Sequence, residues 1–373
     1  MINKDRLIAT FLDLVHINSP SKSERPIADY VCPVLKDIGF SIVEDDAGAK
    51  IGGSCGNLIA TMEGTASSGA RLFFNAHMDT VEPTDGIRVI VENNVIKTDG
   101  NTVLGADCKS GVALILESAR TAVEQGIPFK SLQIVFSVAE EIGLLGARNM
   151  DTSLLSADVG YVFDTERPAG QIITAAPTHE NLMVKIYGRA SHAGIRPEDG
   201  VSAIVAASRA IASMKLGRID EETTANVGVI RGGRARNIVP DEVEIYAEAR
   251  SRDEMKLQAQ VRHMVETFES SAFDIGAKAE INVEREYRSY RWMPEDPPVR
   301  LAKKAAELIG INPILAEAGG GSDANIFNHA GIPAVVIGVG YEYPHSRGER
   351  LLIDEFVNTA EFAVALLRCS VAA

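Results

Sequence analysis

Apolar positions in the first third of the chain follow helical and strand-like patterns in turn. They recur at helical spacing over 7–15 and 27–38, with Gly39 as a helix stop, and residues 111–123 form a later helical pattern. Short apolar runs without clean alternation lie at 58–62, 72–75, 132–138 and 159–163. Such runs are typical of strands buried on both faces. The pattern predicts an α/β fold with a mostly parallel sheet flanked by helices.

A different pattern occupies residues 175–292. Strand-like runs and helical patterns alternate there in the order 182–187, 201–212, 225–230, 242–249, 253–270 and 278–285. This β-α-β-β-α-β order predicts a ferredoxin-like α+β domain. In the fourth segment Val243, Ile245, Ala247 and Ala249 alternate with polar residues, which indicates one buried face and one solvated face. The expected buried face of the first helix comprises Val201, Ile204, Val205, Ile211 and Ala212.

The α/β pattern resumes after residues 291–298, a proline-rich segment that we interpret as a return linker. A helix is expected at 299–309, a strand at 334–339 and a closing helix at 354–367. The chain is therefore predicted to form one domain from residues 1–174 and 293–373, with a second domain, residues 175–292, inserted into it.

Composition narrows the range of partners. Lys+Arg 37 against Asp+Glu 51 gives a net charge of −14, which disfavours nucleic acid and anionic membrane surfaces. No apolar run approaches the ~20 residues of a membrane span, and the N-terminal segment lacks the features of a signal peptide. The four cysteines form no CxxC pair, which favours a reducing compartment. We expect a cytoplasmic protein that binds neither nucleic acid nor membrane.

Potential metal ligands follow several of the apolar runs. His77 and Asp79 come after the run at 72–75, and Asp107 lies in a loop before a helix. Glu140 and Glu141 come directly after the run at 132–138. Adjacent glutamates at a buried strand end are costly unless they are paired or bind metal. Each motif alone also fits an ordinary polar turn, an N-cap or a solvated first helical turn.

Two further candidates complete the set. Asp164 ends the run at 159–163, and His345 follows the last apolar strand. Open α/β sheets place ligands at the carboxyl ends of their strands. Two histidines and three carboxylates, one of them bridging, suit a pair of zinc ions held without thiolate. We therefore expect a dinuclear metal site at this edge of the sheet.

In order and spacing, these motifs resemble the dinuclear zinc exopeptidase family that contains peptidase T, glutamate carboxypeptidase, aminoacylase and succinyl-diaminopimelate desuccinylase. The peptidase T-like branch is the most similar. The resemblance covers essentially the whole chain. It includes SHAG at 191–194, GGRARNIVPDEVEIYAEARS at 232–251, GGGSDANIF at 319–327 and the final PHS.

The resemblance implies a role for each residue of the metal site. His77 and Asp164 would hold one zinc ion, Glu141 and His345 the other, and Asp107 would bridge the two. Co²⁺ or Mn²⁺ could replace Zn²⁺. Asp79 would orient His77, and Glu140 would be the general base. A zinc-bound water has a pKa near ~7, so hydroxide is available at neutral pH.

The resemblance also assigns residues outside the metal site. His192 would stabilise the oxyanion across a dimer interface, and Arg250 would contact the substrate carboxylate. Substrate contacts are further implied for Asn237, Gly320, Gly321 and Ser322. Residues 175–292 would be a lid and dimerisation domain, so the chain would be a homodimer. The other histidines, His16, His179, His263 and His329, are expected to be structural.

The leading hypothesis is a zinc-dependent aminopeptidase that cleaves short peptides, above all tripeptides. An N-acyl amino acid amidohydrolase or a carboxypeptidase of the same family is the alternative. A non-catalytic metal-binding protein would not need Glu140 beside Glu141. A nicotinamide-dependent oxidoreductase would fit the α/β pattern, but no strand-linked GxGxxG is present.

Overall fold

The computed structural model describes residues 1–371, and the chain in it divides into two compact units. The first unit comprises Met1–Thr174, Arg291–Glu317 and the segment from Ser322 onward. The second comprises Ala175–Tyr290 together with Ala318–Gly321. None of the helices within residues 1–371 combines the length and the apolar character that a membrane crossing requires.

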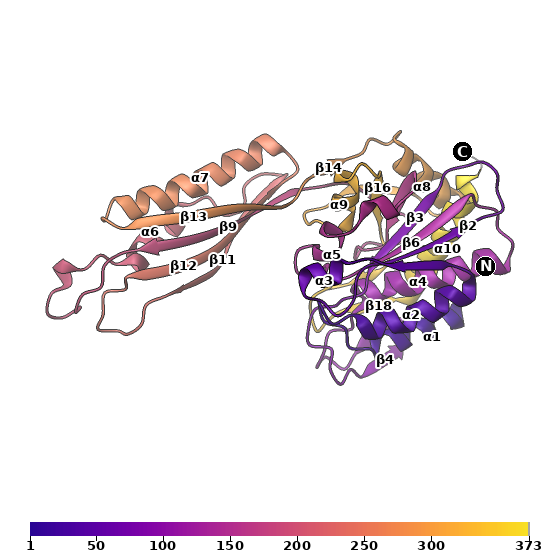
Figure 1. Ribbon diagram of the computed structural model, residues 1–373, viewed down its shortest axis with the longest axis horizontal. Coiled ribbons are helices and arrows are strands. Elements are labelled where there is room, and N and C mark those ends of the chain that lie inside the picture. The colour runs from indigo at the N-terminus through magenta and orange to yellow at the C-terminus, as the bar shows by residue number, and fades with distance from the viewer. Residues whose placement is uncertain (372–373) are drawn as a thin grey trace. The chain divides into compact units, whose positions relative to one another are not determined.

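A nine-stranded sheet forms the centre of the first unit, in the order β1-β2-β6-β3-β7-β16-β8-β14 with β15 beside β8 (Figure 1). The strands are β1 Ser41–Glu44, β2 Leu58–Glu63, β3 Leu72–His77, β6 Ser131–Ser137, β7 Val159–Val162, β8 Gln171–Ala176, β14 Tyr290–Arg291, β15 Ile314–Glu317 and β16 Ala334–Ile337. The four central strands, β6, β3, β7 and β16, run parallel. Antiparallel strands β2 and β8 flank them. The predicted α/β fold with a mostly parallel central sheet is confirmed.

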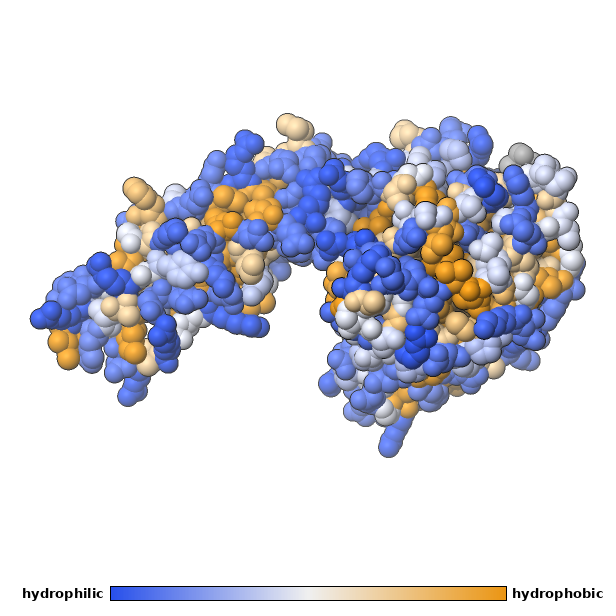
Figure 2. Space-filling view, viewed as in Figure 1, coloured by the Kyte–Doolittle hydropathy of each residue, from blue (hydrophilic) through white to orange (hydrophobic). Residues whose placement is uncertain are grey.

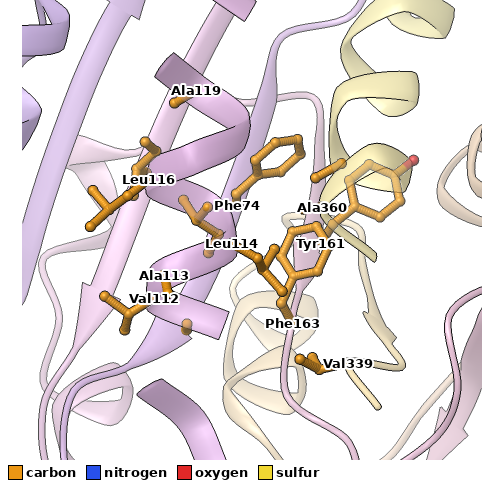
Figure 3. Close-up of a cluster of buried hydrophobic side chains, with 14 of the residues drawn as sticks. Phe74, Val112, Ala113, Leu114, Leu116, Ala119, Tyr161, Phe163, Val339 and Ala360 are labelled. Carbon is orange, nitrogen blue, oxygen red and sulfur yellow. The ribbon is translucent and has the colours of Figure 1, made fainter. Parts of the chain in front are cut away.

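Helices cover this sheet. They are α1 Lys4–Val15, α2 Arg25–Ile38, α3 Ala47–Ile51, α4 Ala106–Glu124, α5 Leu145–Arg148, α8 Pro297–Leu308, α9 Asp323–His329 and α10 Ile353–Ser370. Gly39 ends α2 in the left-handed region at φ 115°, as a helix stop should. The core of this layer is aromatic: Phe74 meets Phe163 edge to face, with ring centroids 5.3 Å apart, beside α4 (Figure 3). On the other face of the sheet, Phe73 packs against Phe327 of α9.

A smaller antiparallel sheet lies beside the main sheet within the first unit, in the order β17-β18-β5-β4. Its strands are β4 Val89–Glu92, β5 Val95–Thr98, β17 Tyr341–Glu342 and β18 Arg350–Leu352. These strands are short and only partly buried, so their sequences carry little hydrophobic pattern, and the sequence analysis did not anticipate them. The hairpin formed by β17 and β18 carries His345 in its loop.

The second unit is an antiparallel sheet with helices α6 and α7 packed on it. Its elements are β9 Thr178–Tyr187, α6 Ala203–Ser213, β10 Gly217–Arg218, β11 Thr223–Gly232, β12 Glu242–Ser251, α7 Glu254–Phe273 and β13 Lys278–Tyr287. The strand order β10-β11-β12-β9-β13 confirms the predicted ferredoxin-like arrangement. The predicted alternation in β12 is also confirmed, because Val243, Ile245, Ala247 and Ala249 are all buried.

The predicted buried face of α6 is wrong. Its buried residues are Ala203, Ala206, Ala207 and Ala210, whereas Ile204 and Val205 are 39% and 42% exposed. Small side chains allow this helix to lie close to the sheet, whereas Ile204 and Val205 point outward and Ile211 is only partly buried. In Figure 2 the face in view is mostly hydrophilic, with scattered groups of apolar residues.

The expected loop around Asp107 also differs. Helix α4 begins at Ala106, so Asp107 lies in its first turn, although Asp107 and Cys108 have non-helical backbone angles. The structure therefore has an irregular helix start where the sequence pattern indicated a loop.

Candidate metal centre

Three parallel strands bring three predicted metal ligands and the predicted general base to one edge of the central sheet. His77 is the last residue of β3, Glu140 and Glu141 follow β6, and Asp164 follows β7. Strand β3 lies between the other two, with His77 opposite Ser137 of β6. Because the carboxyl ends of parallel strands meet at one edge, residues distant in sequence lie close together here.

Asp107 stands between the two histidines. Its Oδ1 lies 3.2 Å from Nε2 of His77, and its Oδ2 lies 3.3 Å from Nε2 of His345. Asp164 approaches the same His77 nitrogen at 3.5 Å, and Glu141 approaches His345 at 2.9 Å. Two groups of potential ligands therefore share one carboxylate: His77, Asp107 and Asp164 form one, and Asp107, Glu141 and His345 form the other.

Cys108 also lies within reach of the first group. Its Sγ donates a hydrogen bond to the carbonyl oxygen of Phe163 at 2.8 Å, and burial raises the pKa of the thiol well above its usual value. Because this hydrogen bond directs the thiol toward the carbonyl oxygen, Cys108 is less suited to bind metal than the nitrogen and oxygen donors beside it. This leaves nitrogen and oxygen donors in both groups, as the sequence analysis expected.

Glu140 lies outside both groups, with its Oε2 3.9 Å from Nε2 of His77. Burial and the charges of neighbouring acids raise the pKa of Glu140 well above its usual value, although His77 opposes this effect. The adjacent Glu141 contacts His345 instead. The two glutamates thus have different neighbours in spite of their adjacency.

Asp79 holds the turn that carries both glutamates. Its carboxylate accepts hydrogen bonds from the backbone N–H groups of Glu140 and Glu141, at 3.0 and 3.2 Å, and from the Ser21 hydroxyl at 2.7 Å. Burial alone would raise the pKa of Asp79, but His77 and these donors lower it. The His77 ring is held by the backbone oxygen of Asp79, which accepts from Nδ1 at 2.9 Å. Asp79 is therefore in contact with His77, and its role in orienting that ring stays a prediction.

The electrostatics of this cluster fit divalent cations. Burial, together with the neighbouring carboxylates, raises the pKa of Asp164 and of Glu141. Hydrogen bonds to Asp107 and Glu141 raise the pKa of His345 to about 10. Oε1 of Glu141 is buried and has no hydrogen-bond partner. Several buried carboxylates close together, one with an oxygen that has no hydrogen-bond partner, cost folding free energy unless cations neutralise their charge. The residues present therefore fit the predicted pair of metals.

The predicted substrate contact Ser322 also belongs to the first unit. Its hydroxyl accepts a hydrogen bond from the N–H of Ala324, and its own N–H donates to the side chain of Asn325. Ser322 is thus the N-cap residue of α9. Asp323, which the sequence analysis passed over, is fully buried and accepts a hydrogen bond from Ser137. Burial raises the pKa of Asp323 to about 6.

The predicted residues of the second unit form two separate groups. In one, Arg250 donates to the Tyr287 hydroxyl at 3.3 Å and to Glu248 at 2.9 Å. The same hydroxyl accepts from the N–H of Gly321 at 3.0 Å, so Gly320 and Gly321 lie beside Arg250. His179 contacts Glu248 at 3.0 Å and is thus linked to this group, although the sequence analysis treated it as merely structural.

The other group contains His192 and Asn237, both exposed. Their segments are joined by the bridge His192–Ile238 and by a hydrogen bond from the N–H of Ala193 to the oxygen of Asn237. Residues 188–201 extend beyond Tyr187 of β9, whereas Arg250 pairs with His179 at the start of that strand. At ~3.3 Å per residue, His192 and Arg250 are at least about 25 Å apart.

Sequence reasoning missed two residues that contact Asp107. Tyr341 and Glu349 are buried, and they lie four positions before and after His345. The hydroxyl of Tyr341 donates to Asp107, and Glu349 accepts a hydrogen bond from the N–H of Asp107. Glu349 lies in the same sequence motif as His345, but its burial and its contact with Asp107 are visible only in the structure.

Comparison with known proteins places this geometry in context. The protein-family model for Peptidase family M20/M25/M40 matches residues 73–368 of this chain. The uncharacterized protein YqjE of Bacillus subtilis is 44% identical over 98% of this chain and 99% of its own length. Two solved structures match over 100% of both chains. They are aminopeptidase PepT from Bacillus cereus, at 42% identity and TM-score 0.91, and a tripeptidase from Staphylococcus aureus, at 39% and 0.96.

Proposed function

Because the chain belongs to peptidase family M20/M25/M40, we propose that it is a metal-dependent aminopeptidase that removes the N-terminal residue of short peptides, above all tripeptides. The expected resemblance to the peptidase T-like branch is confirmed, and the protein is a hydrolase. The observation that carries the specific proposal is the pair of ligand groups that share Asp107, with Glu140 outside both.

The proposed cofactor is a pair of Zn²⁺ ions, with Co²⁺ or Mn²⁺ as substitutes. His77 and Asp164 would hold one ion, Glu141 and His345 the other, and Asp107 both, in keeping with the two ligand groups. When bound, such ions polarise a scissile carbonyl and lower the pKa of water.

Glu140 is the proposed general base. Its carboxylate would take a proton from the attacking water as the new C–O bond forms. It would then give that proton to the leaving amine as the C–N bond breaks. A base must not be tied up as a ligand, and the position of Glu140 outside both ligand groups supports this role.

Residues of the second unit would bind the substrate. His192 would donate a hydrogen bond to the oxyanion, and Arg250 would contact the peptide carboxylate. The exposure of His192 and the buried, unpartnered Nε of Arg250 support these roles. Asn237, Gly320, Gly321 and Ser322 are proposed as further substrate contacts; Gly321 is linked to Arg250 through Tyr287.

We also propose a homodimer in which His192 serves the partner's active site. A tripeptide spans only ~10 Å. One second unit therefore cannot present both His192 and Arg250, which are about 25 Å apart on it, to one short substrate. Within the described residues, β10 pairs with only Thr224 and Ala225 of the edge strand β11. The remaining edge of β11 and the exposed Ile204, Val205 and Ile230 offer a pairing surface.

In this proposal the first unit is the catalytic domain and the second a lid and dimerisation domain. A cytoplasmic location is proposed from the unpaired cysteines, among which Cys55, Cys108 and Cys369 are buried.

The experiment that tests the activity is product identification. Zinc-loaded protein is incubated with Ala-Ala-Ala and with its N-acetylated form. The proposal predicts alanine and Ala-Ala from the free peptide and no cleavage of the blocked one. Release of acetate, or of a C-terminal residue from the blocked peptide, would favour the alternative, an N-acyl amino acid amidohydrolase or a carboxypeptidase.

A further inference from the structure

The hairpin of β17 and β18 contacts Asp107 through three side chains at intervals of four residues. Tyr341 donates its hydroxyl to Oδ1 of Asp107 at 3.2 Å, and His345 approaches Oδ2 at 3.3 Å. Glu349 accepts a hydrogen bond from the backbone N–H of Asp107 at 2.9 Å. His345 is a proposed ligand, but nothing so far accounts for the other two.

Glu349 accepts hydrogen bonds from three backbone N–H groups at and just before the start of α4. Its Oε2 accepts from the N–H groups of Leu104 and Gly105, at 2.9 and 2.7 Å, while its Oε1 accepts from Asp107. The first N–H groups of a helix have no partner within the helix. Glu349 lies 242 residues from Asp107 in sequence and is 2% exposed, and it satisfies the N–H group of Asp107 together with two N–H groups that precede the helix.

This geometry requires a carboxylate. Two oxygens that only accept hydrogen bonds face N–H donors on both sides, and an amide has only one such oxygen. A glutamine at position 349 would turn its NH₂ group toward either Asp107 or the Leu104–Gly105 pair. The backbone of Asp107 would then shift or lose its hydrogen bond.

Tyr341 contacts the side chain of Asp107, whereas Glu349 contacts its backbone. Its hydroxyl lies 3.2 Å from Oδ1 of Asp107 and 3.4 Å from Oδ1 of Asp164. Both carboxylates belong to the ligand group of His77. Tyr341 is 2% exposed, so this hydroxyl is held in place by the core around it.

We propose that Glu349 and Tyr341 are positioning residues that fix the shared carboxylate of Asp107 for two metal ions. Glu349 sets the backbone of Asp107 and therefore acts on both ligand groups. Tyr341 contacts Oδ1 of Asp107, the oxygen nearer His77, and also Asp164, which belongs to the group of His77 alone. This inference rests on the proposed metal centre.

Metal affinity is the direct test, measured by calorimetric titration of chelator-stripped protein with Zn²⁺. Glu349→Gln should weaken both binding steps, each by ~10–100-fold, which is typical for loss of a residue that orients a ligand. Tyr341→Phe should weaken one step by a similar factor and the other step less, because only Asp107 is shared between the two groups.

Glu117→Gln is the matched control. Glu117 is 3% exposed, lies in the same unit and also accepts a backbone hydrogen bond, from Asn3 at 3.0 Å. Its loss should lower the stability of the apo protein and leave both zinc affinities at wild-type values. A merely structural role for Glu349 would produce the same result in Glu349→Gln.

Folded Glu349→Gln with two wild-type affinities would overturn the proposal, and so would Tyr341→Phe with no change in either step. If Glu349→Gln does not fold, as judged by circular dichroism, the result for Tyr341→Phe decides. A wild-type chain that binds no zinc would instead contradict the proposed function, and this inference with it.

Discussion

Two adjacent glutamates at the end of β6 illustrate how neighbours, not residue type, determine chemistry. Glu141 contacts His345 at 2.9 Å, and one of its oxygens is buried without a hydrogen-bond partner. Glu140 lies 3.9 Å from His77 and outside both ligand groups. The hydrogen bonds from both backbone N–H groups to Asp79 fix the turn that separates the two side chains.

Substitution should separate their roles. Glu140→Gln should retain two metals per chain and lower kcat by ~10²–10⁴-fold, because it removes only proton transfer. Glu141→Gln should lose metal. Elemental analysis and steady-state kinetics on both variants check this. If Glu140→Gln empties a metal site while Glu141→Gln does not, the assignments are reversed.

His179 provides a pH-dependent prediction in the second unit. Burial lowers its pKa, but Glu248 and Glu286 outweigh burial and raise it above 6.5. A raised pKa in the folded protein means that the protonated histidine stabilises the fold below about pH 6.5, and that this contribution is lost as the pH rises through the folded-state pKa.

The free energy of unfolding should therefore differ more between wild type and His179→Asn at pH 6 than at pH 9. Urea unfolding over this range measures the difference. The non-titrating control Gln260→Ala, also buried in the second unit, should show a constant difference. A difference for His179→Asn that grows with pH would contradict the account.

At the scale of elements, hydrophobic patterns predicted the long, well-buried segments. Helices α1 and α2 bury one face at helical spacing, and β12 alternates between buried and more exposed residues. The central strands and α4 are mostly apolar segments that are buried almost throughout, so they too could be recognised from the sequence. The strand ends also indicated where ligands gather. In α6, by contrast, alanines face the sheet, so hydrophobicity pointed to the wrong face.

The β17–β18 hairpin could not be predicted in this way. Its strands have two and three residues, too few for any period to emerge, and its contacts with Asp107 are more than 200 residues away in sequence. His345 was identified through its motif, whereas Tyr341 and Glu349 required the three-dimensional structure.

The packing of α4 on β3 gives a stability prediction. Phe74 is fully buried against Phe163 and Tyr161 (Figure 3). Phe74→Ala should lower the free energy of unfolding by ~3–5 kcal/mol, since it removes buried apolar surface and leaves a cavity. Val91→Ala is the control, because Val91 is 51% exposed. Equal losses in both variants by chemical denaturation would contradict the assignment of this core.

At the scale of the whole molecule, the proposed dimer makes each active site depend on two chains. His192 and Arg250 are about 25 Å apart within one second unit, because Arg250 pairs with the start of β9 and His192 lies beyond its end. If His192 serves the partner's site, a chain that lacks it remains able to receive the partner's histidine.

Mixing His192→Ala with Glu140→Gln chains should therefore restore part of the activity that each variant lacks. One site of the heterodimer then has Glu140 from one chain and His192 from the other. His192→Ala alone should reduce kcat by ~10²–10³-fold, the usual effect of removing one oxyanion donor, with metal content unchanged. No recovery in a heterodimer verified by differential tagging would show that His192 does not act across an interface.

The central claim is that two ions, held by ligands that share Asp107, make this chain a peptidase. Stepwise addition of Zn²⁺ to chelator-stripped protein, with release of alanine from Ala-Ala-Ala measured at each step, tests it most directly. The account predicts no activity without metal and full activity at two equivalents per chain. Full activity in the stripped protein, or a plateau at one equivalent, would contradict it.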